Sequence, residues 1–127
     1  KEVMADLTYA LKSVVTGGTG AAALGLGRPA AGKTGTSQSN ASAWFAGYTP
    51  QLSATVALFR DSASESLNGI GGLTSVTGGT FPAKIWTAFM KGALKDEPVM
   101  SFPAPANIGG LEPVVMTSGG RQTMKKK

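Results

Sequence analysis

The stretch Lys33-Thr34-Gly35-Thr36 combines more chemically capable groups than any other short window of the chain. The lysine supplies a fixed positive charge, and the two threonines supply hydroxyls that can hold a carboxylate. The glycine between them has no side chain, so a second backbone can lie against the chain at that point. These residue types therefore predict a site for an anionic or peptide-like ligand.

A phosphate-binding loop is one interpretation, because residues 27–34 fit the pattern G-x-x-x-x-G-K-[ST]. Such a loop needs a buried strand before it and a helix after it, so that free N–H groups and the helix dipole face the phosphates. Residues 16–26 are too rich in glycine for a buried strand, and Gly35 interrupts the first turn of a following helix. The flanking sequence therefore disfavours a nucleotide site.

An edge strand over residues 30–36 is the second interpretation, with Lys-Thr-Gly-Thr at its exposed end. The free N–H and C=O groups of an edge strand can pair with a peptide-like substrate, as in strand addition. This arrangement matches the K-T-G box of penicillin-binding proteins and serine β-lactamases.

Composition excludes several other kinds of site. The 127 residues suffice for one small domain. The net charge is +5, and three of the basic residues are the lysines at positions 125–127, at the end of the chain. Because no basic stripe is interleaved with aromatics, we expect no nucleic-acid partner. The chain has no cysteine and no histidine, which removes thiol chemistry, Ser-His-Asp catalysis and the usual zinc ligands, and we expect no cofactor or metal. No signal peptide or apolar run of membrane-spanning length is visible.

Hydrophobic spacing predicts two helices and three strands. One helix is expected over residues 2–15, and since the chain opens inside it, we expect a fragment of a longer protein. Residues 16–27 are expected to form a loose, mobile connection. Strands are predicted over 30–36, 43–49 and 52–60, and their short connections favour an antiparallel meander. A second helix begins near Phe81, with Pro82 at its first position.

The strand over 43–49 contains Trp44, Phe45 and Tyr48, which we expect in the core because large aromatic side chains dominate core burial. Gly47 is expected where another group approaches closely or at a bulge. Apolar residues on both faces of the strands predict helices on each side of the sheet. Residues 61–79 are predicted to be a long loop with a short turn near 70–73. A Pro/Gly-rich tail is predicted over 96–127, after a domain over 1–95.

Three segments together resemble the C-terminal half of a class A penicillin-binding protein, a bifunctional peptidoglycan synthase. They are A-G-K-T-G-T at 31–36, A-W-F-A-G-Y-T-P at 43–50 and G-G-T-F-P-A-K-I-W at 78–86. The resemblance covers residues 1–95 and implies an α+β fold, in which these three strands belong to a five-stranded antiparallel sheet packed against helices. It also implies a place at the extracytoplasmic face of the bacterial membrane, with the anchor outside this chain.

The resemblance implies a serine D,D-transpeptidase that cross-links peptidoglycan stem peptides at their D-Ala-D-Ala ends and is acylated by β-lactams. Lys33 would support a proton-relay serine and attract the substrate carboxylate, which Thr34 and Thr36 would hold. The N–H of Thr36 would form half of the oxyanion hole, and Gly35 would keep the strand clear for the peptide. Lys33 and Thr36 are thus the catalytic candidates.

The family's S-x-x-K nucleophile box is absent from the sequence, and no convincing S-x-N box is present. We therefore expect this chain to need the missing N-terminal half of its domain and to form no acyl-enzyme alone. A D,D-carboxypeptidase or β-lactamase piece of the same fold remains an alternative, as does a non-catalytic module of this fold, with a phosphate-loop protein less favoured.

Overall fold

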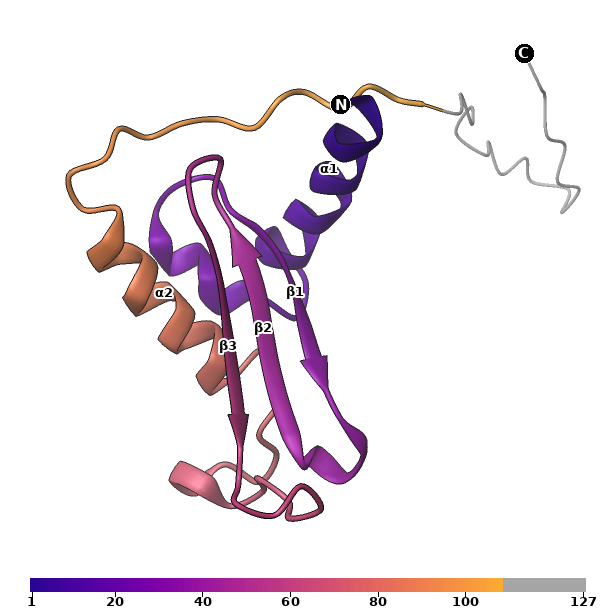
Figure 1. Cartoon of the computed structure of the whole chain (residues 1–127), viewed down its shortest axis with the longest axis vertical. Coiled ribbons are helices and arrows are strands. Elements are labelled where there is room, and N and C mark those ends of the chain that lie inside the picture. Colours follow the sequence, from indigo (N-terminus) through magenta and orange to yellow (C-terminus); the bar gives the residue numbers. More distant parts are fainter. Residues whose placement is uncertain (109–127) are drawn as a thin grey trace, which may run out of the picture.

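A computed structural model describes residues 1–108 of the chain (Figure 1). Within this range, no helix is long and apolar enough to cross a membrane. In chain order, the helices, 3₁₀ turns and strands are α1 (Glu2–Thr16), η1 (Ala21–Leu26), β1 (Ala31–Thr36), η2 (Gln38–Asn40), β2 (Ser42–Tyr48), β3 (Ser53–Phe59), η3 (Ile70–Gly72) and α2 (Phe81–Ala93).

The three strands form one antiparallel sheet in the order β1-β2-β3. Ala31 pairs with Tyr48 at one end of the β1–β2 ladder, and Thr36 pairs with Ala43 at the other. The meander predicted from the short connections is therefore confirmed. Each observed strand bound lies within one residue of the predicted one.

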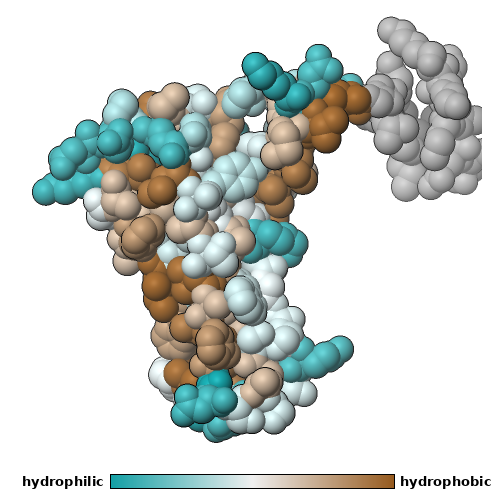
Figure 2. Space-filling view, in the orientation of Figure 1, coloured by the Kyte–Doolittle hydropathy of each residue, from teal (hydrophilic) through white to brown (hydrophobic). Residues whose placement is uncertain are grey.

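The pairing register sorts the side chains into two faces, because directly opposite residues of neighbouring strands share a face. Thr34, Phe45 and Val56 lie on one face, which α2 covers. Lys33 and Ala46 lie on the other face and are exposed. In Figure 2, hydrophobic surface gathers over the β3 and α2 side of the view shown.

The core is built around Trp86 of α2, whose side chain is completely buried. Its indole meets the Phe45 ring edge-on, with centroids 5.2 Å apart. Its Nε1–H donates to the carbonyl oxygens of Gly47 and Ala54 at 3.3 and 3.1 Å, so the buried polar atom is satisfied. A Cβ on Gly47 would lie 2.9 Å from the indole. Gly47 is thus a close-approach position, as predicted.

Trp44 is a correction to the predicted core, because 43% of its surface is exposed. Successive strand residues point to opposite faces, so burial of Phe45 against α2 turns Trp44 to the Lys33 face. Phe45 is in the core as predicted, and Tyr48 is half-buried. The expectation of a helical cover on both faces was also wrong for residues 1–108, in which Trp44 and Phe59 stay exposed.

The connection over residues 16–27 is better packed than predicted. Its second half forms the 3₁₀ turn η1, where Ala23 and Leu26 are buried in the main core cluster. Thr87 Oγ1 of α2 lies 3.2 Å from the Ala22 carbonyl oxygen and 2.7 Å from the Ala83 carbonyl oxygen, so its one hydrogen is shared between them. The small side chains of this segment let it pack directly against α2. From the sequence alone, the same small side chains had suggested mobility.

Residues 96–108, here called the strap, run from the end of α2 past the β2–β3 turn to the first half of α1 (Figure 1). Gln51 Nε2 donates to the Pro98 carbonyl at 2.9 Å. The Phe102 ring packs edge-on against Tyr48, with centroids 5.5 Å apart. The Asp6 carboxylate accepts the N–H groups of Ala106, Asn107 and Ile108. The rest of the predicted tail, residues 109–127 with the terminal lysines, lies outside the described residues.

The contact between Asp6 and the strap should depend on pH. The N–H groups of Ile108 and Asn107 lower the pKa of Asp6 below its usual value of 3.8, since they stabilise the charged carboxylate. A depressed pKa in the folded protein means that the contact is fully present above the unfolded value and is lost as the pH falls through the folded value. In an NMR titration, the amide shifts of residues 106–108 should therefore move with a midpoint below 3.8.

The Asp6→Asn variant is the control for this titration, because it removes the titrating group and should leave those amide shifts flat across the same acidic range. A midpoint at or above 3.8 in the unaltered chain would contradict the assignment.

Candidate functional site

The outer edge of β1 is the site that the sequence predicted. Within residues 1–108, β1 pairs with β2 alone, so its other edge carries no strand. The Ser37 N–H bonds to the Ser42 carbonyl at 3.0 Å, one step beyond the last registered pair. Hydrogen-bonded and non-bonded pairs alternate along an antiparallel ladder. Counting back from Ser37, the main chain faces β2 at residues 35, 33 and 31, and faces the edge without a strand at residues 36, 34 and 32. Gly32 is buried, so this edge is accessible at residues 34 and 36.

Lys33 brings its charge to this open edge. Its side chain is exposed, and its Nζ donates to the carbonyl oxygen of Thr34 at 3.0 Å. That carbonyl belongs to the outward-facing set, so the ammonium group lies along the free rim of the strand. In the part of the chain that the structure describes, the one ion pair joins Arg60 and Glu65 at 2.9 Å. The Lys33 ammonium is thus without a carboxylate partner in that part.

Two threonine hydroxyls flank the rim and are tied to neighbouring segments. Thr34 Oγ1 lies 2.7 Å from Thr19 Oγ1, in the connection before η1. Thr36 Oγ1 accepts the N–H of Gly78 at 3.2 Å. A hydroxyl offers one donor and two acceptor sites. The Thr36 hydroxyl therefore keeps its own hydrogen for a ligand, while its position is fixed from behind.

Gly35 and Gly78 bring backbones close together at the rim. A Cβ on Gly35 would meet the Trp44 side chain at 3.4 Å, an ordinary contact on the Lys33 face. A Cβ on Gly78 would collide with the Trp44 carbonyl oxygen and would lie 2.8 Å from the Gly35 carbonyl oxygen. The loop before α2 thus passes directly beneath β1 and β2, on the face opposite Lys33.

The structure brings all four predicted site residues, Lys33 to Thr36, to one strand edge. The strand is followed by the short turn η2, so the strand–loop–helix order that a phosphate loop requires is not formed around Lys33. Sequence reasoning missed Thr19, which lies in a glycine-rich stretch without a recognisable signal. It also missed the role of Gly78 behind Thr36, although the paired glycines before a helix were visible.

Residues 1–69 match the family model described as the penicillin binding protein transpeptidase domain. Penicillin-binding protein 1A of Mycolicibacterium smegmatis is 38% identical over 115 residues, which cover 87% of this chain and 14% of that protein. Penicillin-binding protein 1A of Mycobacterium tuberculosis is 36% identical over 114 residues, which cover 86% of this chain and 14% of that protein.

Solved structures show the same fold. The penicillin-binding protein PonA1 from Mycobacterium tuberculosis matches with a TM-score of 0.77 and 34% identity, over 93% of this chain and 34% of that one. A second PonA1 structure, in complex with penicillin V, matches with a TM-score of 0.74 and 36% identity, over 86% of this chain and 30% of that one.

These matches confirm the α+β fold of an antiparallel sheet packed against helices that the sequence predicted. The chain spans 14% of the length of each of the two curated relatives described above. The family match extends over more than half of the chain, and the relatives are penicillin-binding proteins of the 1A type, as the resemblance implied. The chain belongs to the penicillin-binding protein transpeptidase domain family.

Proposed function

We propose that this chain supplies the substrate-binding wall of a serine D,D-transpeptidase. In that reaction a serine attacks the penultimate D-alanyl carbonyl of a stem peptide, terminal D-alanine leaves, and an amine of a neighbouring stem accepts the acyl group. One observation carries the proposal: the main chain of residues 34 and 36 faces an edge without a strand, along which the Lys33 ammonium lies. A peptide end can pair with such an edge as an added strand.

Lys33 has two roles in this proposal. Its ammonium attracts the carboxylate of the D-Ala-D-Ala end and supports the serine that relays the proton. The position of Nζ at the outer rim, 3.0 Å from the Thr34 carbonyl, is consistent with both roles. A positive charge placed before the reaction stabilises developing negative charge more effectively than water does, because it needs no reorganisation.

Thr34 and Thr36 bind the same carboxylate through their hydroxyls, and the outward N–H of Thr36 donates to the oxyanion. Removal of one such donor typically costs about 3 kcal/mol of transition-state stabilisation. Gly35 keeps the strand clear, so that the incoming peptide reaches main-chain pairing distance. Support comes from the fixed positions of both threonines, which Thr19 and Gly78 hold from behind.

The partners in this proposal are the peptidoglycan stem peptide, β-lactams and the rest of the transpeptidase domain. β-Lactams imitate the D-Ala-D-Ala end, and the similar PonA1 structure in complex with penicillin V supports their inclusion. The nucleophilic serine comes from the rest of the domain, because the sequence contains no S-x-x-K box. We place the complete enzyme at the extracytoplasmic face of the cell membrane.

Labelling with a fluorescent penicillin tests whether the nucleophilic serine lies outside this chain. We expect the full-length enzyme that carries this segment to be labelled covalently in a gel assay, and the isolated 127-residue chain to stay unlabelled. The control is the full-length enzyme treated first with unlabelled penicillin, which should lose its signal. Stoichiometric labelling of the isolated chain would contradict the proposal, because the nucleophile would then lie within it.

A further inference from the structure

The first half of α1 has little apolar attachment to the rest of the fold. The two buried residues of the helix are Thr8 and Val15, and the first of these is polar. Its other large apolar side chains near the start are exposed, namely Val3, Met4 and Leu7, as is Tyr9. Most helical stability in proteins comes from tertiary packing of one face, and within residues 1–108 the first two turns have little such packing.

The strap supplies a polar attachment at Asp6. The carboxylate accepts three consecutive N–H groups, from Ala106 at 2.6 Å, Asn107 at 2.9 Å and Ile108 at 2.7 Å. Asn107 has a φ of 55°, in the left-handed region. A left-handed residue within a turn directs successive N–H groups toward one point and forms a concavity for an anion. Here the anion is a side chain of the same protein, 100 residues away along the chain.

A second contact links the strap and α1 to the sheet. The Tyr48 hydroxyl lies 2.9 Å from Thr8 Oγ1 of α1. The same tyrosine carries the edge-on contact with Phe102 of the strap. Tyr48 pairs across the ladder with Ala31, which lies two residues before Lys33. Helix, strap and strand therefore meet at the end of the sheet where β1 begins.

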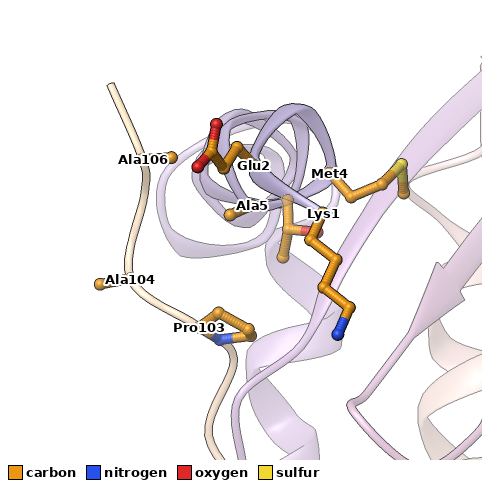
Figure 3. A pocket seen from close by; sticks show the side chains of 8 residues that line it. Lys1, Glu2, Met4, Ala5, Pro103, Ala104 and Ala106 are labelled. Atoms are coloured by element: carbon orange, nitrogen blue, oxygen red, sulfur yellow. The ribbon is translucent and has the colours of Figure 1, made fainter. Parts of the chain in front are cut away.

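Between α1 and the strap lies an open cleft of about 610 Å³, shown in Figure 3. Met4 and Ala5 line it from the helix, and Pro103, Ala104 and Ala106 line it from the strap. This cleft separates part of the helix surface from the strap. Asp6 attaches the strap to α1, and the Phe102–Tyr48 and Gln51–Pro98 contacts attach the strap to β2 and to the β2–β3 turn.

We propose that the strap holds the first half of α1 against the start of β1, and that Asp6 positions the strap on α1. The inference concerns the fold of the chain and does not depend on the proposed enzymatic function. Loss of the Asp6 carboxylate should release residues 106–108 and loosen the first two turns of α1, while the core around α2 keeps its protection.

Hydrogen exchange of the full-length enzyme that carries this segment, followed by mass spectrometry, tests the proposal. In Asp6→Ala, we expect amides 106–108 to exchange at least about tenfold faster, since each hydrogen bond to a charged group is lost. Amides 2–9 should also exchange faster, and amides 81–93 of α2 should be unchanged. Asp61→Ala is the matched control, because it removes an exposed loop carboxylate and should change none of these segments.

Two results would overturn the proposal. One is equal exchange of amides 106–108 in the unaltered chain and in Asp6→Ala. The other is release of the strap with no change in amides 2–9. If Asp6→Ala also exposes α2, Phe102→Ala is measured instead, because it weakens the strap without altering α1; unchanged exchange of amides 2–9 in that variant would equally overturn the proposal.

Discussion

Replacement of Lys33 by alanine in the full-length enzyme is expected to slow acylation by penicillin by about 100- to 1,000-fold, the range seen when a preorganised electrostatic group is removed from an active site. The ammonium group lies at the open rim of β1, where it bonds the Thr34 carbonyl. In the proposed function, its loss removes the charge that attracts the ligand carboxylate and that supports proton relay. The second-order rate constant for labelling by a fluorescent penicillin measures the effect.

A change in protein stability should not account for the slower acylation, because Lys33 is exposed and makes one hydrogen bond, to the main chain. The melting temperature of Lys33→Ala should match that of the unaltered enzyme. Lys84→Ala, which removes an exposed lysine on α2 far along the chain, is the matched control and should acylate normally. A Lys33→Ala enzyme that acylates within a few-fold of normal would rule out the proposed role.

Replacement of Trp86 by alanine is expected to destabilise the domain by about 3–5 kcal/mol, the usual cost of deleting a large aromatic side chain from a core. Trp86 is completely buried, packs edge-on against Phe45 and satisfies its indole N–H on two strand carbonyls. Because domains are stable by only about 5–15 kcal/mol in total, the change removes a large share of the stability. Urea unfolding of the complete domain measures it.

Phe89→Ala provides a matched control on the same helix. Phe89 lies three residues further along α2, and 55% of its surface is exposed in this chain. Its loss should therefore cost much less than the loss of Trp86. Trp86→Phe should fall between the two, since it keeps an aromatic ring beside Phe45 but has no N–H for the strand carbonyls. Equal destabilisation by Trp86→Ala and Phe89→Ala would contradict this description of the core.

Local sequence patterns predicted the parts of the site that local chemistry determines. The lysine, threonines and glycine of 33–36 indicated an edge strand, and the neighbouring apolar runs indicated the other two strands of the sheet. Trp44 was misplaced because aromatic content alone does not say which of two adjacent residues faces the helix. That choice follows from the register, in which Phe45 and Val56 share the face covered by α2.

Contacts between distant segments could not be predicted from a single sequence. Asp6 lies in the first half of α1, and its partners lie 100 or more residues away along the chain. Thr19 likewise owes its position beside Thr34 to the packing of η1 on α2. In both cases the signal is a polar residue within an unremarkable stretch, and its partner is set by how the chain folds back.

The close passage of Gly78 beneath Gly35 and Trp44 couples the back of the sheet to the front. At this point the backbone of Gly78 contacts the backbone of Gly35 and Trp44 directly, with no side chain between them that could change rotamer. Close-packed interiors transmit strain. We therefore expect a movement at the entry to α2 to displace the strand that carries Lys33. If the proposed function is right, substitutions at Gly78, behind the sheet, are therefore expected to alter acylation by β-lactams through the position of Lys33.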